Sequence, residues 1–569
     1  MHDFEHTVLE WMQSPFDTAT QEEVRKLRKD PAALEDAFYK NLAFGTGGMR
    51  GKMGVGTNRI NQYTIGKNTQ GLSNYLKICF PNEQIKAVVA YDCRHNSSAL
   101  AKTVADVFTA NGIKCFLFSE LRTTPELSFA VRHLKAHCGI VLTASHNPPE
   151  YNGYKVYWQD GGQIVPPHDT ALSSAIERVK FEDVLFAPRK ELLELINTTI
   201  DKAYQKVVVS LAAIGRGNRN QLTIVFTPLH GTSITAIPQV LEQAGYKHIY
   251  LVEEQANPDG NFPTVSSPNP EEPQALAMAI EKGLEIGADI VFGTDPDSDR
   301  LGIAVRNKKG NFVLLNGNQM MVVMTQYLLD YWQRNGRITG NQFIATTIVS
   351  TPLLSKMAKS YGVGYQETLT GFKWIGKRIH DYPNLEFIGG GEESFGYLIG
   401  DQVRDKDAVS AALLACEMAS DLKETGSTLM NLLEDCYRKY GFYQERLVSI
   451  TKEGKEGLKS IENTMKDYRK KPPQKIAGIS VVSVEDYQTS VKKNFGALAD
   501  AAIDLPISNV LLFHLADDSK IALRPSGTEP KIKFYFSVNQ PFDSTTSWEQ
   551  QQEKLNRKID RLQDEMVKI

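Results

Sequence analysis

Short apolar runs alternate with spans of helical periodicity through most of this chain, and that alternation is the strongest constraint on its fold. The first group of apolar runs covers 87–91, 113–118 and 138–142, with helical patterns over 97–110 and 125–136 between them. Runs that are apolar throughout are typical of strands covered on both faces, and strands joined by helices pair in parallel. We therefore predict largely parallel sheets packed between helices.

The same alternation recurs twice further along the chain. The predicted elements are strands over 222–226, 248–252 and 289–292, then a helix over 317–336, strands near 343–349 and 385–389, and helices across 407–440. Residues 170–214, between the first two groups, are predicted to form a long helical stretch. Three similar units indicate an internal repeat rather than a solenoid.

The two ends of the chain depart from this pattern. Residues 3–44 carry apolar side chains at helical spacing, and Pro31 after Asp30 suits the start of a new helix. After residue 441, strands are predicted over 443–450, 478–484, 510–514, 520–523 and 532–538, with helices near 453–469 and 546–567. This succession of strands, with only two helices, predicts a separate α+β domain with an antiparallel sheet.

Composition limits the classes of protein to consider. A chain of 569 residues exceeds what one hydrophobic core serves, so several domains are expected. The net charge of -3 gives no electrostatic reason to expect nucleic acid or a membrane surface as a partner. We find no secretory signal, no apolar run long enough to span a membrane and no close Cys-x-x-Cys pair, so we expect a reduced, cytoplasmic protein.

The segment 143–155 follows the predicted strand 138–142 and concentrates reactive groups. Ser145 offers a hydroxyl, His146 an imidazole and Lys155 an ammonium, and two consecutive prolines keep the intervening loop out of a helix. Open α/β sheets bind their ligands at the carboxyl ends of strands. The alternative is a polar surface turn in which Ser145 satisfies the backbone.

Three carboxylates follow the predicted strand 289–292 at alternate positions, on Asp295, Asp297 and Asp299. Alternation in an extended backbone aims them at one point, where oxygen ligands suit a hard divalent cation. The calcium loop of an EF-hand is excluded, because it needs glycine and glutamate where this chain has Arg300 and Arg306. Three carboxylates are too few to enclose Ca²⁺, whereas Mg²⁺ is commonly held by a few protein ligands and a phosphate oxygen. The alternative interpretation is an acidic turn exposed to solvent.

Three further loops carry polar groups beside glycines. The turn 44–51 presents Arg50 among free backbone amides and is either an anion-binding nest or a flexible turn. In 390–396, Glu392 and Ser394 offer groups that could hold sugar hydroxyls, unless the loop is an acidic surface turn. The segment 524–531 combines arginine, hydroxyls and a glycine as a phosphate clamp would, or is a plain hairpin turn.

Taken together and in order, these loops resemble those of the α-D-phosphohexomutase superfamily. The resemblance covers essentially the whole chain and implies an α/β fold of three αβα sandwich domains with mixed, largely parallel sheets. A C-terminal α+β domain similar to TATA-box-binding protein would complete a central cleft. The expected domains are 1–210 with the Ser145 loop, 211–316 with the aspartates, 317–440 with the sugar-binding loop and 441–569 with the phosphate-binding loop.

The resemblance also implies a reaction and its residues. Ser145 would carry a phosphoryl group and, with the three aspartates, bind Mg²⁺, while a sugar 1,6-bisphosphate would serve as intermediate and activator. Roles in proton transfer, charge balance or lining of the cleft fall to His146, Lys155, Arg50 and Arg300. Substrate would be bound by Lys373, Glu392, Ser394, Arg524, Ser526, Gly527 and Thr528. His230 is equally compatible with a cleft role and a structural role.

The preferred substrate follows from finer features of the same resemblance. The Glu-Glu-Ser-Phe-Gly sequence at 392–396 resembles that of glucose-type mutases, and 152–158 resembles the branch that contains phosphoglucomutase-2 and phosphopentomutase. Glucose 1-phosphate is expected first, with pentose or mannose phosphates as alternatives. A non-catalytic sugar-phosphate-binding protein and a net phosphatase or bisphosphate synthase also stay open. The partners expected are small sugar phosphates, and the protein is expected to be a monomer or homodimer.

Overall fold

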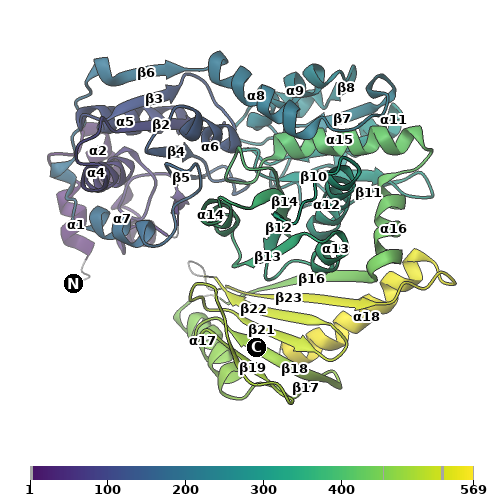
Figure 1. Ribbon diagram of the computed structural model, residues 1–569. Coiled ribbons are helices and arrows are strands. Elements are labelled where there is room, and N and C mark those ends of the chain that lie inside the picture. Colours follow the sequence, from purple (N-terminus) through teal and green to yellow (C-terminus); the bar gives the residue numbers. More distant parts are fainter. Residues whose placement is uncertain (1–3, 46, 453, 527–530, 568–569) are drawn as a thin grey trace. The chain divides into compact units, whose positions relative to one another are not determined.

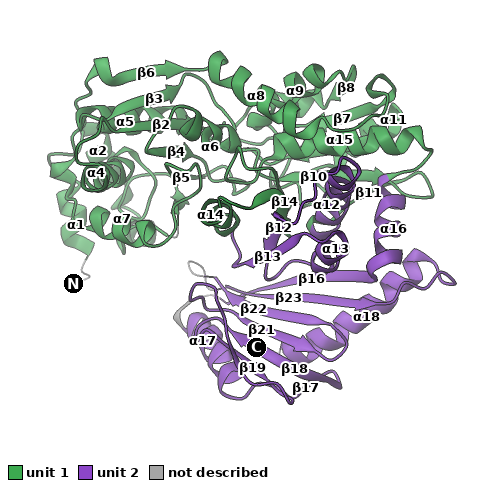
Figure 2. Cartoon of the chain, viewed as in Figure 1, with its two compact units in different colours: residues 1–317, 372–428 green, residues 318–371, 429–569 purple. Residues whose placement is uncertain are grey.

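The computed structural model describes residues 4–45, 47–452, 454–526 and 531–567. Figure 2 shows the two compact units of the chain, of which unit 1 comprises 1–317 and 372–428 and unit 2 comprises 318–371 and 429–569. Within the described ranges, every helix is too short or too polar to cross a bilayer.

Unit 1 contains a six-stranded mixed sheet in the order β1-β5-β4-β2-β3-β6 (Figure 1). Its strands are β1 (Gly48–Lys52), β2 (Lys86–Tyr91), β3 (Lys114–Phe118), β4 (Cys138–Leu142), β5 (Tyr151–Trp158) and β6 (Leu193–Ile196). The strands β4, β2, β3 and β6 are mutually parallel, whereas β5 and β1 add antiparallel strands at one edge. The predicted strands at 87–91, 113–118 and 138–142 are confirmed.

Helices cover both faces of this sheet. On one face lie α4 (Gln62–Cys79), α5 (Ser97–Ala110) and α7 (His168–Glu177), whose apolar side chains share one core with Val89 and Ile140. On the other lies α6 (Thr124–His133), so close that a Cβ atom on Gly139 would stand 2.5 Å from Val131. Because both faces are covered, β4 and the part of β2 after Lys86 show no polar alternation.

The predicted long helical stretch over 170–214 is helical at its two ends but wrong in the middle. The segment contains α7, short 3₁₀ turns, the edge strand β6 and only then α8 (Thr198–Ala212). The sequence of β6, Leu-Glu-Leu-Ile, forms helices well, but parallel pairing with β3 holds it extended. Tertiary pairing therefore overrides the local helical preference.

A second sheet in unit 1 has the order β11-β10-β9-β7-β8. Its strands are β7 (Thr223–Thr227), β8 (His248–Leu251), β9 (Ile290–Thr294), β10 (Leu301–Arg306) and β11 (Phe312–Leu314). The strand β7 is parallel to β8 and β9, as predicted, while β10 returns antiparallel to β9. Packed on the sheet are α11 (Ala277–Glu285) and α15 (Ala408–Glu424), while α9 (Ile237–Ala244) packs against α8 and α15, and the short α10 (Glu253–Ala256) follows β8.

Unit 1 also holds the N-terminal helices and one hairpin with its preceding helix. The helices are α1 (Phe4–Glu10), α2 (Thr18–Leu27) and α3 (Pro31–Phe38), and the later elements are α14 (Lys373–Asp381), β14 (Glu386–Glu392) and β15 (Gly396–Ile399). Trp11 is fully buried and its ring contacts Phe16, Phe38 and Tyr63. The predicted helix start at Pro31 is confirmed, with Asp30 as its N-cap.

Unit 2 ends in an antiparallel sheet in the order β16-β23-β22-β21-β18-β19-β20, with β17 beside β18. Before it come α12 (Gly317–Arg334), the parallel pair β12 (Gln342–Thr347) and β13 (Gly364–Thr368), α13 (Leu353–Tyr361) and α16 (Leu429–Tyr440). The sheet strands are β16 (Phe442–Thr451), β17 (Lys475–Ile476), β18 (Ile479–Asp486), β19 (Val491–Asn494), β20 (Ala501–Ala502), β21 (Leu511–Leu515), β22 (Lys520–Pro525) and β23 (Lys531–Gln540). Two helices, α17 (Gly454–Lys470) and α18 (Trp548–Met566), pack on it. The predicted combination of an antiparallel sheet with two helices after residue 441 is confirmed.

Candidate active site

The loop after β4 presents Ser145 in a left-handed backbone conformation, with φ of 53°. The residue is 3% exposed, and its N–H donates to Thr143 Oγ1 at 2.9 Å. Its hydroxyl donates to Asp295 Oδ2 at 2.8 Å and lies 3.1 Å from His146 Nδ1. The serine hydroxyl is therefore held between an imidazole on its own loop and a carboxylate from the second sheet.

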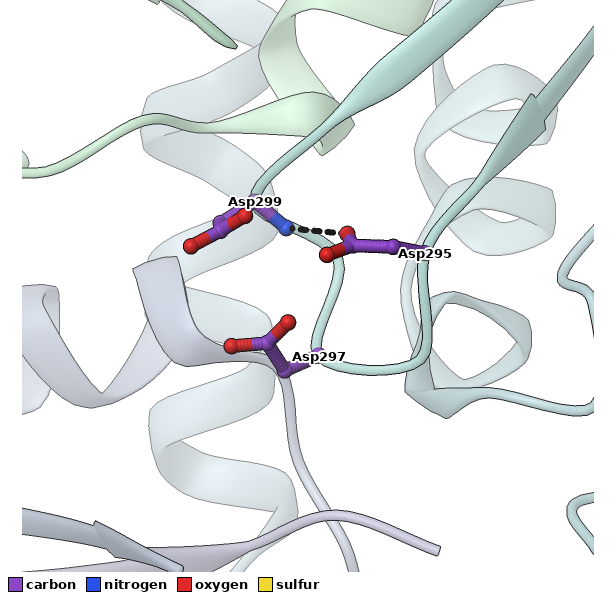
Figure 3. Close-up of side chains that lie close together, drawn as sticks. All are labelled: Asp295, Asp297 and Asp299. Atoms are coloured by element: carbon purple, nitrogen blue, oxygen red, sulfur yellow. Dashed lines mark hydrogen bonds between the residues drawn. The ribbon is translucent and has the colours of Figure 1, made fainter. Parts of the chain in front are cut away.

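The turn between β9 and β10 brings three carboxylates together, as Figure 3 shows. Asp295, Asp297 and Asp299 are buried, and ligand oxygens of the three lie within 4.8 Å of one another. Asp295 Oδ1 accepts the backbone N–H groups of Asp299 at 3.1 Å and Arg300 at 3.0 Å, which closes the turn. The alternate spacing of the aspartates thus becomes convergence at one point.

This cluster fits a hard divalent cation. Asp297 Oδ1 and Asp299 Oδ1 are buried without a hydrogen-bond partner, which is costly unless a ligand satisfies them. Burial, and then the charges of the other two carboxylates, raise the pKa of Asp295 well above its usual value. A metal ion would relieve both the repulsion and the unsatisfied oxygens, and all-oxygen ligands are those that Mg²⁺ prefers.

Two lysines, Lys406 buried and Lys155 partly buried, face the same carboxylates. Lys155 Nζ lies 2.6 Å from Asp297 Oδ2 and 3.2 Å from Asp299 Oδ2, and Lys406 Nζ lies 3.2 Å from both Asp299 Oδ2 and Glu392 Oε1. Burial alone would lower the pKa of Lys155, but the two aspartates raise it above the usual value. Both side chains are therefore cations that balance the acidic cluster.

Sequence reasoning missed Lys406. It also missed Thr124, the first residue of α6, whose Oγ1 donates to Asp297 Oδ2 and whose N–H donates to the Asp297 carbonyl, both at 2.9 Å. The charged run Asp405-Lys406-Asp407 directly before the apolar helix α15 was an available sign of a buried ion pair. Thr124 could not be identified in this way, because threonine is common at helix starts and does not by itself indicate a contact with a distant carboxylate.

Two predicted arginines lie around the serine loop. Arg50, on β1, is exposed and its Nη1 donates to Asn147 Oδ1 at 2.8 Å. Arg300 forms an ion pair with Glu271 and has its Nε 3.9 Å from Asp299 Oδ1. Burial, and then the charges of these two arginines, lower the pKa of His146 well below its usual value. The imidazole is consequently neutral at neutral pH, so one of its ring nitrogens carries a free lone pair.

The predicted sugar-binding residues lie on and near the β14–β15 hairpin. Glu392 ends β14, is buried and pairs with Lys406, and Ser394 lies in the turn that follows. Lys373 begins α14, where burial, opposed by the charge of Asp169, lowers its pKa to about 8. Lys406 thus pairs with Glu392 of the predicted sugar-binding loop and with Asp299 of the aspartate cluster. The charged neighbour of Lys373 is instead Asp169, on α7.

The predicted phosphate-binding residues belong to unit 2. Arg524 lies on β22 opposite Lys533, and the Ser526 N–H donates to the Lys531 carbonyl at 2.7 Å. Gly527 and Thr528 lie outside the described residues. His230, in unit 1, has Nδ1 3.2 Å from the Asn257 carbonyl and Nε2 2.9 Å from Thr264 Oγ1, as a structural histidine would.

Family models match three consecutive stretches of the chain. They describe α/β/α domains I, II and III of phosphoglucomutase/phosphomannomutase and match residues 41–183, 202–310 and 316–440 respectively. The three αβα domains expected from the sequence are therefore confirmed, and the sheet-rich C-terminal region follows them.

Proteins named phosphoglucomutase are similar over most of the chain. One from Staphylococcus epidermidis is 38% identical over 511 residues, which are 89% of this chain and 92% of that protein. One from Staphylococcus aureus is 40% identical over 513 residues, which are 89% of this chain and 91% of that protein. Each aligned region thus spans nearly the full length of both chains.

Solved structures share the fold at low sequence identity. A phosphoglucomutase/phosphomannomutase family protein from Burkholderia thailandensis aligns with a TM-score of 0.67 at 18% identity, covering 92% of this chain and 98% of that one. The open form of parafusin from Paramecium, titled a phosphoglucomutase, aligns with a TM-score of 0.67 at 17% identity, covering 92% and 95%.

Proposed function

This chain belongs to the phosphoglucomutase/phosphomannomutase family, and we propose that it interconverts glucose 1-phosphate and glucose 6-phosphate through a phosphoserine and glucose 1,6-bisphosphate. The observation that carries the proposal is the 2.8 Å hydrogen bond from the Ser145 hydroxyl to Asp295, inside a cluster of three buried carboxylates. The choice of glucose rests on the relatives named phosphoglucomutase at 38% and 40% identity.

In the forward step, the P–O bond to Ser145 Oγ breaks as a sugar hydroxyl oxygen bonds to phosphorus; the sugar hydroxyl loses its proton to a base, and the base passes that proton to the departing Ser145 Oγ. His146 Nδ1 is our choice of base, since it is neutral and lies 3.1 Å from Ser145 Oγ. In the return step, the other phosphate of the bisphosphate moves to Ser145 Oγ, and the Ser145 hydroxyl proton passes through the same nitrogen to the sugar oxygen that leaves. Lys155 balances charge, because its two carboxylate partners keep it protonated.

Ser145, Asp295, Asp297 and Asp299 are the residues that would hold Mg²⁺. When bound, Mg²⁺ supplies charge neutralisation on the transferred phosphoryl group. Thr124 and Lys155 orient Asp297 through its Oδ2, which leaves Oδ1 as the free ligand atom. The chain itself therefore determines which carboxylate oxygen faces a cation.

Substrate contacts are proposed for residues of five segments. Glu392, Ser394 and Lys373 would bind sugar hydroxyls or phosphate, Arg50 and Arg300 would balance phosphate charge, and Arg524, Ser526, Gly527 and Thr528 would clamp the phosphate that is not transferred. Because the intermediate must present either phosphate to Ser145, that clamp has to accept both orientations. We also propose four domains with boundaries at 210, 316 and 440, and a cytoplasmic monomer or homodimer.

A coupled assay tests the activity and the substrate together. The protein is supplied with Mg²⁺ and a trace of the matching sugar bisphosphate, and the turnover of glucose 1-phosphate, ribose 1-phosphate and mannose 1-phosphate is compared. We expect glucose 1-phosphate to have the highest kcat/KM. A preference for ribose 1-phosphate would make the protein a phosphopentomutase, and no turnover of any substrate would leave only a binding function.

A further inference from the structure

Arg94 contacts the Ser145 loop at four backbone carbonyls. Its Nη1 donates to Pro148 O at 2.8 Å and Tyr151 O at 3.0 Å, and its Nη2 donates to Ser145 O at 2.7 Å and to Asn147 O. A guanidinium carries five N–H donors in a rigid planar fork, so one side chain can serve several acceptors at fixed angles. The Arg94 guanidinium thus fixes the backbone of the loop from Ser145 to Tyr151 by hydrogen bonds to four of its carbonyls.

The guanidinium is itself held in place from two sides. Asp92 Oδ2 lies 3.4 Å from Arg94 Nε, and neither side chain is exposed at all. Asp92 Oδ1 accepts the Arg94 N–H and the Ser97 hydroxyl, both at 2.9 Å. The ring of Phe262, from the segment between β8 and β9, lies 5.1 Å from the guanidinium carbon. Arg94 therefore has little freedom to follow a moving loop.

This arrangement bears directly on the serine. A non-glycine residue at φ of 53° is strained and persists only where its surroundings impose that conformation. Arg94 binds the Ser145 carbonyl, and Thr143 binds its N–H, so both peptide groups that flank the residue are fixed. Without the guanidinium, the loop can relax and carry the hydroxyl away from Asp295.

We propose that Arg94 is a positioning residue that keeps the Ser145 hydroxyl in line with the aspartate cluster, an inference that rests on the proposed role of Ser145 as phosphoryl carrier. Arg94 acts through the backbone of the loop and touches no reacting atom. Its loss should therefore lower kcat without weakening the binding of sugar phosphate. A merely structural arginine would instead lower stability and leave the folded enzyme with its normal kcat.

The first test compares Arg94→Lys and Arg94→Ala with Arg219→Ala. Arg219 is a matched control, because it pairs with Glu417 at 2.7 and 2.8 Å, and its polar contacts within the described ranges do not include the serine loop. We expect kcat of Arg94→Lys to fall about 100-fold, as misplacement of a reacting group by about 1 Å does, with KM for glucose 1-phosphate within about twofold. Millimolar guanidinium ion should partly restore Arg94→Ala, while Arg219→Ala keeps wild-type kcat.

The second test does not depend on activity. Hydrogen–deuterium exchange of the peptide over 145–152 should be about tenfold faster in Arg94→Lys than in the wild type and unchanged in Arg219→Ala. Normal exchange, or a folded Arg94→Lys enzyme with kcat within twofold of wild type, would overturn the inference. An inactive wild type would instead overturn the proposed function and leave the exchange result interpretable.

A milder variant covers the case in which neither Arg94 variant folds. Phe262→Leu removes the ring face but keeps the ion pair and all four carbonyl contacts. Faster exchange of the 145–152 peptide and a kcat several-fold below wild type would support the inference, and wild-type values of both would contradict it.

Discussion

The hydroxyl of Ser145 and the carboxylate of Asp295 lie 2.8 Å apart, although 150 positions separate the two residues in the chain. Ser145 follows β4 of the first sheet and Asp295 follows β9 of the second, and both strands pair in parallel with a neighbour in their own sheet. The contact therefore joins the carboxyl ends of parallel strands from two sheets, and α/β folds bind ligands at such strand ends.

Replacement of Ser145 by alanine should abolish turnover while the protein stays folded. The side chain is buried rather than at the surface, but the loss of one hydroxyl should cost only about 1 kcal/mol of unfolding free energy. We expect kcat to fall by at least about 10⁴-fold, as for other lost nucleophiles. The coupled assay and thermal unfolding measure the two quantities, with Ser128→Ala as a buried-serine control. An active Ser145→Ala enzyme would exclude the phosphoserine.

The aspartate cluster predicts a metal requirement that depends on Asp297. Its Oδ1 is buried without a partner, so Asp297→Asn removes a charge from the site while nearly preserving shape. The Mg²⁺ concentration for half-maximal activity should rise at least about tenfold, equivalent to about 1.4 kcal/mol of binding free energy. Asp289→Asn, at the partly exposed ion pair with Lys423, is the control. An unchanged Mg²⁺ requirement would remove Asp297 from the metal site.

Lys406→Met should reduce kcat/KM by roughly 10²- to 10³-fold. Lys406 lies 3.2 Å from both Asp299 and Glu392, so its loss leaves two buried carboxylates without their shared cation, a change that costs about 3 to 5 kcal/mol in comparable buried pairs. We expect the KM for glucose 1-phosphate to rise as Glu392 moves. Lys102→Met, in an exposed pair with Asp106, should behave as wild type. Equal kinetics of the two variants would rule out this role.

Glu485 in unit 2 should contribute to loss of stability in acid. Burial alone would raise its pKa, but hydrogen bonds from His514, Tyr487 and Lys492 outweigh that effect and lower the pKa to about 2. Because the folded-state pKa lies below the usual 4.5, the contribution is complete above pH 4.5 and is lost as the pH falls toward 2. The contribution of Glu485 to the free energy of unfolding is at most about 3 kcal/mol.

The check is the thermal midpoint of wild type and Glu485→Gln between pH 6 and pH 3. The wild type should lose more stability over this range, because the glutamine has no carboxylate to protonate. Equal losses in the two proteins would show that Glu485 does not titrate with folding.

The sequence by itself determined the local features of this protein. Mainly apolar runs marked β2, β3 and β4, because a strand covered on both faces needs no polar alternation. The spacing of Asp295, Asp297 and Asp299 indicated convergence, because it depends only on a few consecutive backbone angles. Asp30 and Pro31 marked a helix start for the same local reason.

Only the tertiary structure decided which distant groups complete the site. Lys406 reaches Asp299 from more than 100 positions away and Thr124 reaches Asp297 from 173 positions away, so no local pattern could pair them. The strand β6 likewise exists because β3 offers it an edge to pair with. A buried carboxylate requires a cation or a hydrogen-bond donor as its partner, and that requirement can be read from the sequence. Which lysine or hydroxyl becomes the partner depends on how distant elements pack.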